Sequence, residues 1–188
     1  MPSISAPFGL RPSYHPSGLD RAVALPGGIP SGYSTNLLKG QPVALNTSGV
    51  IIAATAGSAF QGAFAGVEFT DTTGRRRVSN YWPASTTGTD IVAYYYSDPT
   101  IVYDIQADGS LAQTSIGDQA NFTNISAGST TTGLSACTIS TSLVGTSAVG
   151  DLRIIGLYPG VDNAWGDTYT IVQVQISRSQ YVATINAI

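Results

Sequence analysis

The side chains that could support catalysis are few, and the single histidine is the first to consider. His15 lies between Tyr14 and Pro16 in a stretch rich in proline and glycine. Nucleophilic catalysis needs a general base held within hydrogen-bonding distance of the nucleophile. A flexible segment cannot hold an imidazole near a serine in that way. We therefore expect His15 to be an exposed or packed aromatic side chain, and the protein to be no enzyme.

Two pairs of carboxylates could serve glycoside hydrolysis, in which one carboxyl group acts as an acid and the other as a base or nucleophile. Glu68 and Asp71 form one pair, and Asp104 and Asp108 form the other. Asp71 and Asp108 fall in predicted turns, where aspartate commonly accepts hydrogen bonds from its own backbone. Neither pair stands out as a catalytic dyad.

Three further stretches could bind an ion, a phosphate or a metal, but a structural role is favoured for each. DNAWGD (162–167) lacks the spacing and the distal glutamate of a calcium loop, so it predicts a hairpin loop. GSTTTG (128–133) has no lysine after its glycines and predicts a polar loop. Cys137, the only cysteine, is expected to be a small buried side chain. We therefore expect no metal site and no cofactor.

The strongest local signal is the positive charge in GRRRVSNYWPAS (74–85). Arg75–Arg77 are consecutive in a chain with only eight lysine and arginine residues, and Tyr81 and Trp82 follow them. In a strand, the first and third arginine would share one face. The cluster could be a solvated edge that discourages sheet-to-sheet pairing. It could instead dock on acidic groups of a partner, because arginine and aromatic side chains often anchor interfaces.

The first 35 residues differ in composition from the remainder of the chain. Proline and glycine punctuate residues 1–35 and disfavour both helices and central strands, so an extended arm is predicted there. The arm could be a disordered terminus, or it could become ordered on a partner surface. Its apolar side chains, which are too many for a purely solvated tail, are Phe8, Leu10, Tyr14, Leu19, Val23 and Leu25.

Residues 36–188 are predicted to form a β-rich core domain, because short apolar or alternating stretches are separated by turn residues. In TIVQVQIS the alternation is clearest: Val172, Val174 and Ile176 would face one way. The predicted strands are 42–45, 49–54, 60–69, 75–82, 91–96, 100–106, 134–140, 151–158 and 168–177.

One segment interrupts this strand pattern. SIGDQANF (115–122) predicts one or two helical turns, with Ser115 as the cap and Asp118 at the third position. No other stretch favours a helix of ordinary length. The fold class expected is all-β, a small barrel or sandwich with an extended N-terminal arm and at most one short helix.

The composition favours a protein that lies against other proteins. Only 10% of the 188 residues are charged, against about a quarter in typical domains. The net charge of -3 argues against a general nucleic-acid binder. We expect no membrane span, because no apolar run is long enough, and no secretory signal.

Several sequence stretches, taken together in their order along the chain, are more diagnostic of a protein family than any one of them alone. These stretches are FGLRPSYHPSG, KGQPVALNTSGVIIAATAGSAFQGAFAGVEFTD, RRRVSNYWPASTTGTDIVAYYYSDPTIVYDIQAD, SIGDQANF, AGSTTTGLSACTIS, LRIIGLYPGVDNAWGD and YTIVQVQIS. In this order, over most of its length, the chain resembles the small head decoration, or cement, proteins of tailed bacteriophages. Gln41 stands where that family often has an acidic residue.

The resemblance implies a non-enzymatic virion protein, made in the bacterial host cytoplasm, on the outer surface of the capsid. Such proteins bridge neighbouring capsomers and stabilise the shell against the pressure of packaged DNA. The implied partners are the major capsid protein and further copies of the chain, commonly as a homotrimer, with no direct contact to nucleic acid or membrane. The candidate capsid or subunit contacts are Phe8, Arg11, Tyr14, Arg75, Arg76, Arg77, Tyr81 and Trp82.

Two other functions remain open from the residues. A carbohydrate- or receptor-binding β module of a phage tail fibre is the main alternative, in which Tyr94, Tyr95, Tyr96 and Trp165 could stack on sugars. A small β-fold hydrolase is the other, and the position of the single histidine counts against it.

Overall fold

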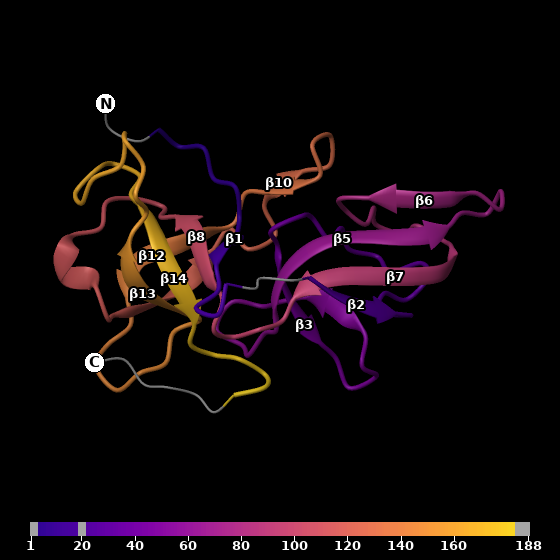
Figure 1. Ribbon diagram of the computed structural model, residues 1–188, viewed down its shortest axis with the longest axis horizontal. Coiled ribbons are helices and arrows are strands. Elements are labelled where there is room, and N and C mark those ends of the chain that lie inside the picture. Colours follow the sequence, from indigo (N-terminus) through magenta and orange to yellow (C-terminus); the bar gives the residue numbers. More distant parts are fainter. Residues whose placement is uncertain (1–3, 19–21, 183–188) are drawn as a thin grey trace.

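The computed structural model describes residues 4–18 and 22–182, and its regular elements are almost all β-strands (Figure 1). In that part of the chain, the one helical element is a short 3₁₀ turn, η1 (Gln113–Ser115). The strands form two six-stranded sheets, here called sheet A and sheet B, and one two-stranded hairpin. The prediction of an all-β fold is confirmed.

Sheet A curls toward a barrel, and its neighbouring strands are all antiparallel. Just beyond β8, Ala107 forms an isolated parallel bridge with Ile139 of β12, four strands away in the sheet, so that the sheet returns to itself at this point. In spatial order its strands are β1 (Arg11–Tyr14), β8 (Val102–Gln106), β14 (Ile171–Ile176), β13 (Leu152–Leu157), β9 (Gln119–Thr123) and β12 (Thr138–Leu143).

The inner face of sheet A holds the larger of two apolar cores. Val172, Val174 and Ile176 of β14 are buried there while the intervening glutamines are partly exposed, which confirms the predicted alternation. Phe60 and Phe122 meet edge to face, with ring centroids 5.1 Å apart and an interplanar angle of 74°.

Sheet B forms the other half of the molecule and is built around the long strand β5 (Figure 1). Along one edge β5 pairs with β7, and along the other it pairs first with β3 and then with β6. The strands are, in order, β2 (Val23–Pro26), β7 (Thr89–Tyr96), β5 (Gly62–Thr70), β3 (Pro42–Leu45) and β4 (Ile51–Ala53), with β6 (Arg76–Ser79) beside β5. The separate hairpin comprises β10 (Gly128–Ser129) and β11 (Leu134–Ser135).

The predicted arm is extended in its described part, and it pairs with the sheets of its own chain. Strand β1 lies at the edge of sheet A and β2 at the edge of sheet B. Edge positions tolerate proline, which explains Pro12 within β1. Between them the chain passes through residues 19–21, so Leu19 of the predicted arm lies outside the described residues, as do residues 1–3. An arm that becomes ordered on a partner surface stays a prediction.

The chain just before β1 requires glycine at position 9. Gly9 has a φ of +75°, and a Cβ atom there would lie 2.6 Å from the carbonyl oxygen of Gly40. The close approach lets the Leu10 amide donate a 2.7 Å hydrogen bond to the same oxygen. Leu10 is consequently fully buried, and it fixes the N-terminal segment to the body.

The helical turns predicted at 115–122 are wrong. The 3₁₀ turn η1 ends where they were expected to begin, and Ile116 is already extended. Gly117 has a φ of +94°, outside the helical region. Residues 119–123 form β9, which pairs with both β12 and β13. Pairing on two sides in sheet A overrides the local capping signal.

Candidate interaction surface

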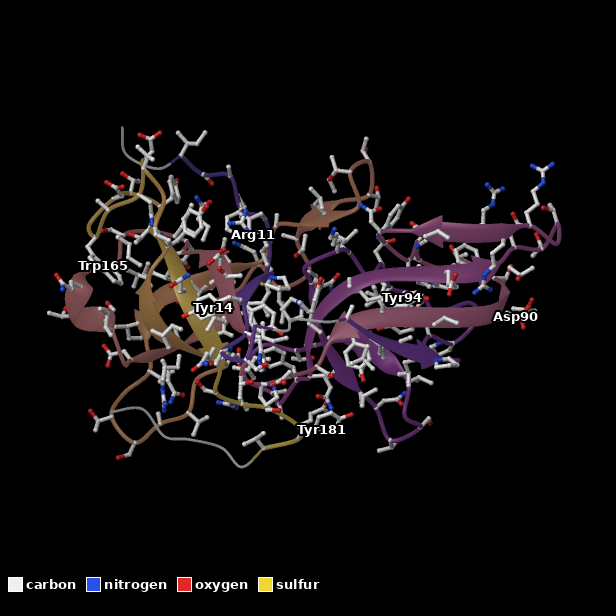
Figure 2. All side chains as sticks on the ribbon, viewed as in Figure 1. Arg11, Tyr14, Asp90, Tyr94, Trp165 and Tyr181 are labelled. Atoms are coloured by element: carbon white, nitrogen blue, oxygen red, sulfur yellow. The ribbon has the colours of Figure 1, made fainter. Side chains whose placement is uncertain are left out.

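The eight candidate contact residues fall into two groups that lie apart. Phe8, Arg11 and Tyr14 belong to the N-terminal segment near the middle of the molecule, whereas the arginine cluster lies on and beside β6 at one end (Figure 1, Figure 2). No single surface therefore contains them all.

Arg11 holds the N-terminal group together. Its Nη2 atom lies 3.1 Å from Oδ2 of Asp104, a carboxylate that is buried in sheet A. The guanidinium also lies over two aromatic rings, with its carbon 4.4 Å from the centroid of Phe8 and 5.5 Å from that of Tyr158. Tyr14, at the end of β1, is 46% exposed. Arg11 is thus partly neutralised, while Tyr14 is free to contact a partner.

A hollow of about 310 Å³ lies beside this group. Its walls are mainly apolar and include Phe8, Leu10, Phe64 and Leu134. Lys39, the only lysine, lies at the hollow with an exposed side chain. No motif in the sequence predicts this hollow, because it depends on the hairpin β10–β11 lying next to the N-terminal segment.

The guanidinium of Arg76 is hydrogen-bonded and ion-paired within its own chain. Its Nη1 donates a 2.7 Å hydrogen bond to the carbonyl oxygen of Asp90, and its Nη2 lies 3.3 Å from Oε1 of Glu68. The hydroxyl of Tyr94 donates a 2.5 Å hydrogen bond to the same Glu68 oxygen. That hydrogen bond is the main cause that lowers the pKa of Glu68, and Arg76 lowers it further.

Arg77 is also paired, through the turn that precedes β6. Its Nε donates a 2.7 Å hydrogen bond to Oδ2 of Asp71. The other carboxylate oxygen accepts hydrogen bonds from the hydroxyl of Thr73 at 2.6 Å and from the amide of Arg75 at 3.0 Å. The Thr73 hydroxyl is the largest of these influences, and together they hold the pKa of Asp71 well below its ordinary value of 3.8. Asp71 caps its own turn, as predicted.

Arg75 is the arginine with an unoccupied charge. Its backbone closes the turn with Asp71, but its exposed side chain has no hydrogen bond or ion pair with any residue that the structure describes. Of the three adjacent arginines, two therefore have an acidic partner among the described residues and one does not.

Strand β6 presents a free edge next to these arginines. One edge pairs with β5, in register from Val67↔Ser79 to Thr70↔Arg76. The opposite edge has no strand partner in residues 4–18 and 22–182. Val78 on this strand is 81% exposed. A groove of about 530 Å³ lies beside β6, lined by residues that include Arg77, Val78 and Tyr81.

Trp82 is not a surface residue, which corrects its choice as a contact candidate. It is 0% exposed and belongs to the core of sheet B. Its ring meets Phe69 edge to face, with centroids 5.1 Å apart, and its backbone forms an isolated bridge with Leu37. Tyr81, the other half of the aromatic pair, is half-buried and lines the groove.

His15 is held more firmly than the sequence suggested. Its Nδ1 accepts a 3.0 Å hydrogen bond from the amide of Ser17, whose Oγ lies 2.5 Å away, so the expectation that no serine lies within reach is wrong. On the other side, Nε2 lies 3.0 Å from Oδ2 of Asp98 and 2.7 Å from Oγ1 of Thr100. The Ser17 contact is local, within a turn closed by Gly18, and the imidazole is packed, with 13% of its side chain exposed.

The other stretches singled out in the sequence have structural roles. Cys137 is fully buried, as predicted, and burial raises the pKa of its thiol. Residues 162–167 lie in the loop that joins β13 to β14, where the Asn163 side chain bonds the backbone of Tyr158 and Ile171. Residues 128–133 form most of the hairpin β10–β11.

The aromatic residues considered for sugar binding do not form one platform. Tyr95 is buried in the core of sheet B, and burial is the main cause that raises its pKa to about 12. Tyr94 and Trp165 lie in opposite halves of the molecule (Figure 2). Stacking on a sugar needs exposed rings close together, and one copy of the chain does not provide them.

The fold and surface together define an all-β protein with exposed protein-contact candidates. Within the described ranges, no group of three or more His, Cys, Asp and Glu side chains could hold a metal ion. None of the helical segments in the same ranges has the length and apolarity needed to cross a bilayer. Comparison with known proteins gave no match: no family model, no curated protein and no solved structure matches the chain.

Proposed function

We propose that this chain is a head decoration protein of a tailed bacteriophage. It binds the outer surface of the assembled shell and bridges neighbouring capsomers, without enzymatic activity. The observation that carries the proposal is β6, an exposed strand that carries Val78 and follows Arg75. Among the described residues, its outer edge has no strand partner and the Arg75 side chain has no acidic partner. A surface of this kind suits protein docking through main-chain and arginine contacts. The resemblance of the ordered sequence stretches to decoration proteins supports the same function.

The partner of the arginine cluster is an acidic surface of the major capsid protein or of a neighbouring subunit. Arg75 can form a new bidentate contact with a carboxylate at once. Arg76 and Arg77 would exchange Glu68 and Asp71 for acids of the partner, so they add less to the affinity. The contact is therefore expected to depend on salt.

Assembly as a homotrimer would multiply weak contacts. Three equivalent patches on one symmetric particle bind together by avidity. Because such binding favours only the assembled shell, it stabilises that shell by mass action. The protein then resists the outward pressure of the packaged DNA, with no direct contact to nucleic acid or membrane.

The arginine contact is tested by replacing Arg75, Arg76 and Arg77 with serine and measuring occupancy on capsids at rising salt. The variant is expected to bind less and with a weaker dependence on salt. Lys39→Ser, which removes another exposed positive charge outside β6, is the comparison for loss of charge and should lower occupancy less than the triple serine variant does. Unchanged occupancy and unchanged salt dependence of the serine variant would reject the contact.

A tail-fibre module is distinguished from a decoration protein by copy number. Shell symmetry gives a decoration protein hundreds of copies per particle, on the order of the number of capsid subunits, whereas a fibre has few. Quantitative mass spectrometry of purified particles measures this number directly.

A further inference from the structure

We propose that the free edge of β6 is a strand-addition site for an extended, carboxylate-bearing segment of a partner protein. This inference deepens the proposed function and rests on it only for the place of the partner in the virion. The chemistry itself follows from the edge, the groove and the charges around β6.

The backbone of β6 can hydrogen-bond on two sides and uses one. In an antiparallel strand, successive residues direct their N–H and C=O groups alternately to the two edges. Residues 76–79 satisfy one edge through β5, and no described strand pairs with the other edge. An exposed edge of this kind is a template for another strand. Added strands bind through main-chain hydrogen bonds and gain specificity from alternate side chains.

The groove gives such a strand a place to lie. Its volume is about 530 Å³, and residues of β6 itself, Arg77 and Val78, are among those that line it. Val78 and Tyr81 offer apolar contact, and Thr86 and Thr87 also line the groove. The threonine hydroxyl groups and the free backbone edge both offer hydrogen-bonding groups. An extended peptide backbone can use them, whereas a compact apolar ligand cannot.

The positive charges next to β6 indicate which kind of partner segment can bind there. Arg75 directly precedes β6 and has no acidic partner in the described ranges, and Arg77 lines the groove with 54% of its side chain exposed. Pairing of β6 with β6 of a second copy would bring like charges together across the strands, which is unfavourable. A segment with glutamate or aspartate on alternate positions would face the arginines instead. The occupant is therefore an acidic strand of another protein.

The test uses the purified full chain and two synthetic peptides. One peptide alternates threonine, valine and glutamate, and the other has lysine in place of each glutamate. Binding is measured by fluorescence anisotropy, and hydrogen exchange reports on the backbone amides of residues 76–79. The glutamate peptide should bind and slow exchange at these amides, whereas the lysine peptide should do neither.

Two variants show whether the glutamate peptide binds at β6. Arg75→Glu reverses a charge that has no partner in the described chain, so the fold should be retained, and we expect binding of the glutamate peptide to weaken by about threefold or more. Lys39→Glu makes the same charge change at an exposed residue outside β6 and should leave binding unchanged. A circular-dichroism spectrum equal to that of the parent confirms that each variant is folded.

Four results would overturn the strand-addition site. They are binding without slower exchange at 76–79, equal binding of the two peptides, preferential binding of a single-stranded oligonucleotide, and no binding of the glutamate peptide at about 1 mM, the weak end of measurable affinity. Because no capsid is present, these results test how β6 binds a partner and do not test decoration of the capsid itself. A chain that decorates capsids but fails this test attaches in another way, and a chain that passes but is absent from capsids has another partner.

Discussion

At the scale of single residues, neighbours within the fold decide what an arginine or an aromatic ring can do. Three adjacent arginines look equivalent in the sequence, yet Arg76 and Arg77 are paired with Glu68 and Asp71, while Arg75 has no acidic partner in residues 4–18 and 22–182. The candidate cluster could be predicted from the run of letters. Which of the arginines are paired could not be predicted. Glu68 is on β5 and Arg76 is on β6, and the local sequence does not reveal that these two strands pair.

The burial of Trp82 gives a prediction about stability. Trp82→Ala removes a fully buried ring that packs on Phe69, and large-to-small changes of this kind cost about 3 to 5 kcal/mol. Urea unfolding followed by circular dichroism should show this loss. Tyr81→Ala, at the adjacent half-buried ring, is the control and should cost about 1 kcal/mol. A Trp82→Ala variant no less stable than the control would place Trp82 outside the core.

The carboxylate of Asp71 gives a prediction about pH. Its pKa in the folded chain is below its ordinary value of 3.8, so its stabilising effect is fully present above that value. The effect is lost as the pH falls below 3.8 toward the lower folded pKa. Asp71→Asn should therefore lower the melting temperature at pH 7 and lower it less at pH 3.

The pH experiment has a simple control. Thr72→Ala changes an exposed residue of the same turn and removes no charge. It should not reproduce the pH-dependent difference. Equal losses of melting temperature for Asp71→Asn at pH 7 and pH 3 would contradict the role given to the charge of Asp71.

At the scale of elements, the strand pattern of the sequence predicts most of the strands, including the edge strands β4 and β6, but not β1, β2, β9 or β10. The predicted strand at 42–45 matches β3, and those at 60–69 and 91–96 overlap β5 and β7 closely. Strands β1 and β2 were not predicted, because proline and glycine argue against central strands and say little about edge strands. The sequence of β9 predicts helical turns instead, because local capping signals cannot show that two neighbouring strands pair with it.

Glutamine side chains fasten both terminal segments to the sheets. The Gln106 amide accepts a 2.9 Å hydrogen bond from the amide of Ala6 and donates one of 2.9 Å to the carbonyl oxygen of Ile4. Gln180 bonds in the same two-way manner to the backbone of Leu45, with both distances 2.8 Å. Each glutamine side-chain amide thus accepts one backbone hydrogen bond and donates another, as the backbone of a paired strand would.

Loss of one glutamine should loosen one segment. Gln106→Ala removes two hydrogen bonds to residues 4–6, each worth about 1 kcal/mol, so local opening should become easier by about 2 kcal/mol. Hydrogen exchange of the Ala6 amide should accelerate accordingly. Gln173→Ala, on the neighbouring strand β14, should leave that amide unchanged. Equal exchange in the two variants would show that other contacts hold the segment.

At the scale of the whole molecule, two sheets with adjoining cores form one elongated body (Figure 1). Its exposed contact candidates lie at separate places: Tyr14 is near the middle (Figure 2), and the free edge of β6, which Arg75 precedes, is at one end (Figure 1). A body with separated contact regions can touch two neighbours at once. This arrangement suits the proposed bridging of capsomers, and avidity in a trimer would strengthen it.

The most direct measurement of the proposed function is a cryo-electron microscopy map of purified mature particles at side-chain resolution. We predict hundreds of copies, on the order of the number of capsid subunits, on the outer surface between capsomers. In each copy, the arginine end of β6 should face an acidic segment of the major capsid protein or of a neighbouring subunit. Absence of the chain from the shell, or its presence only in a few copies on the tail, would contradict the account.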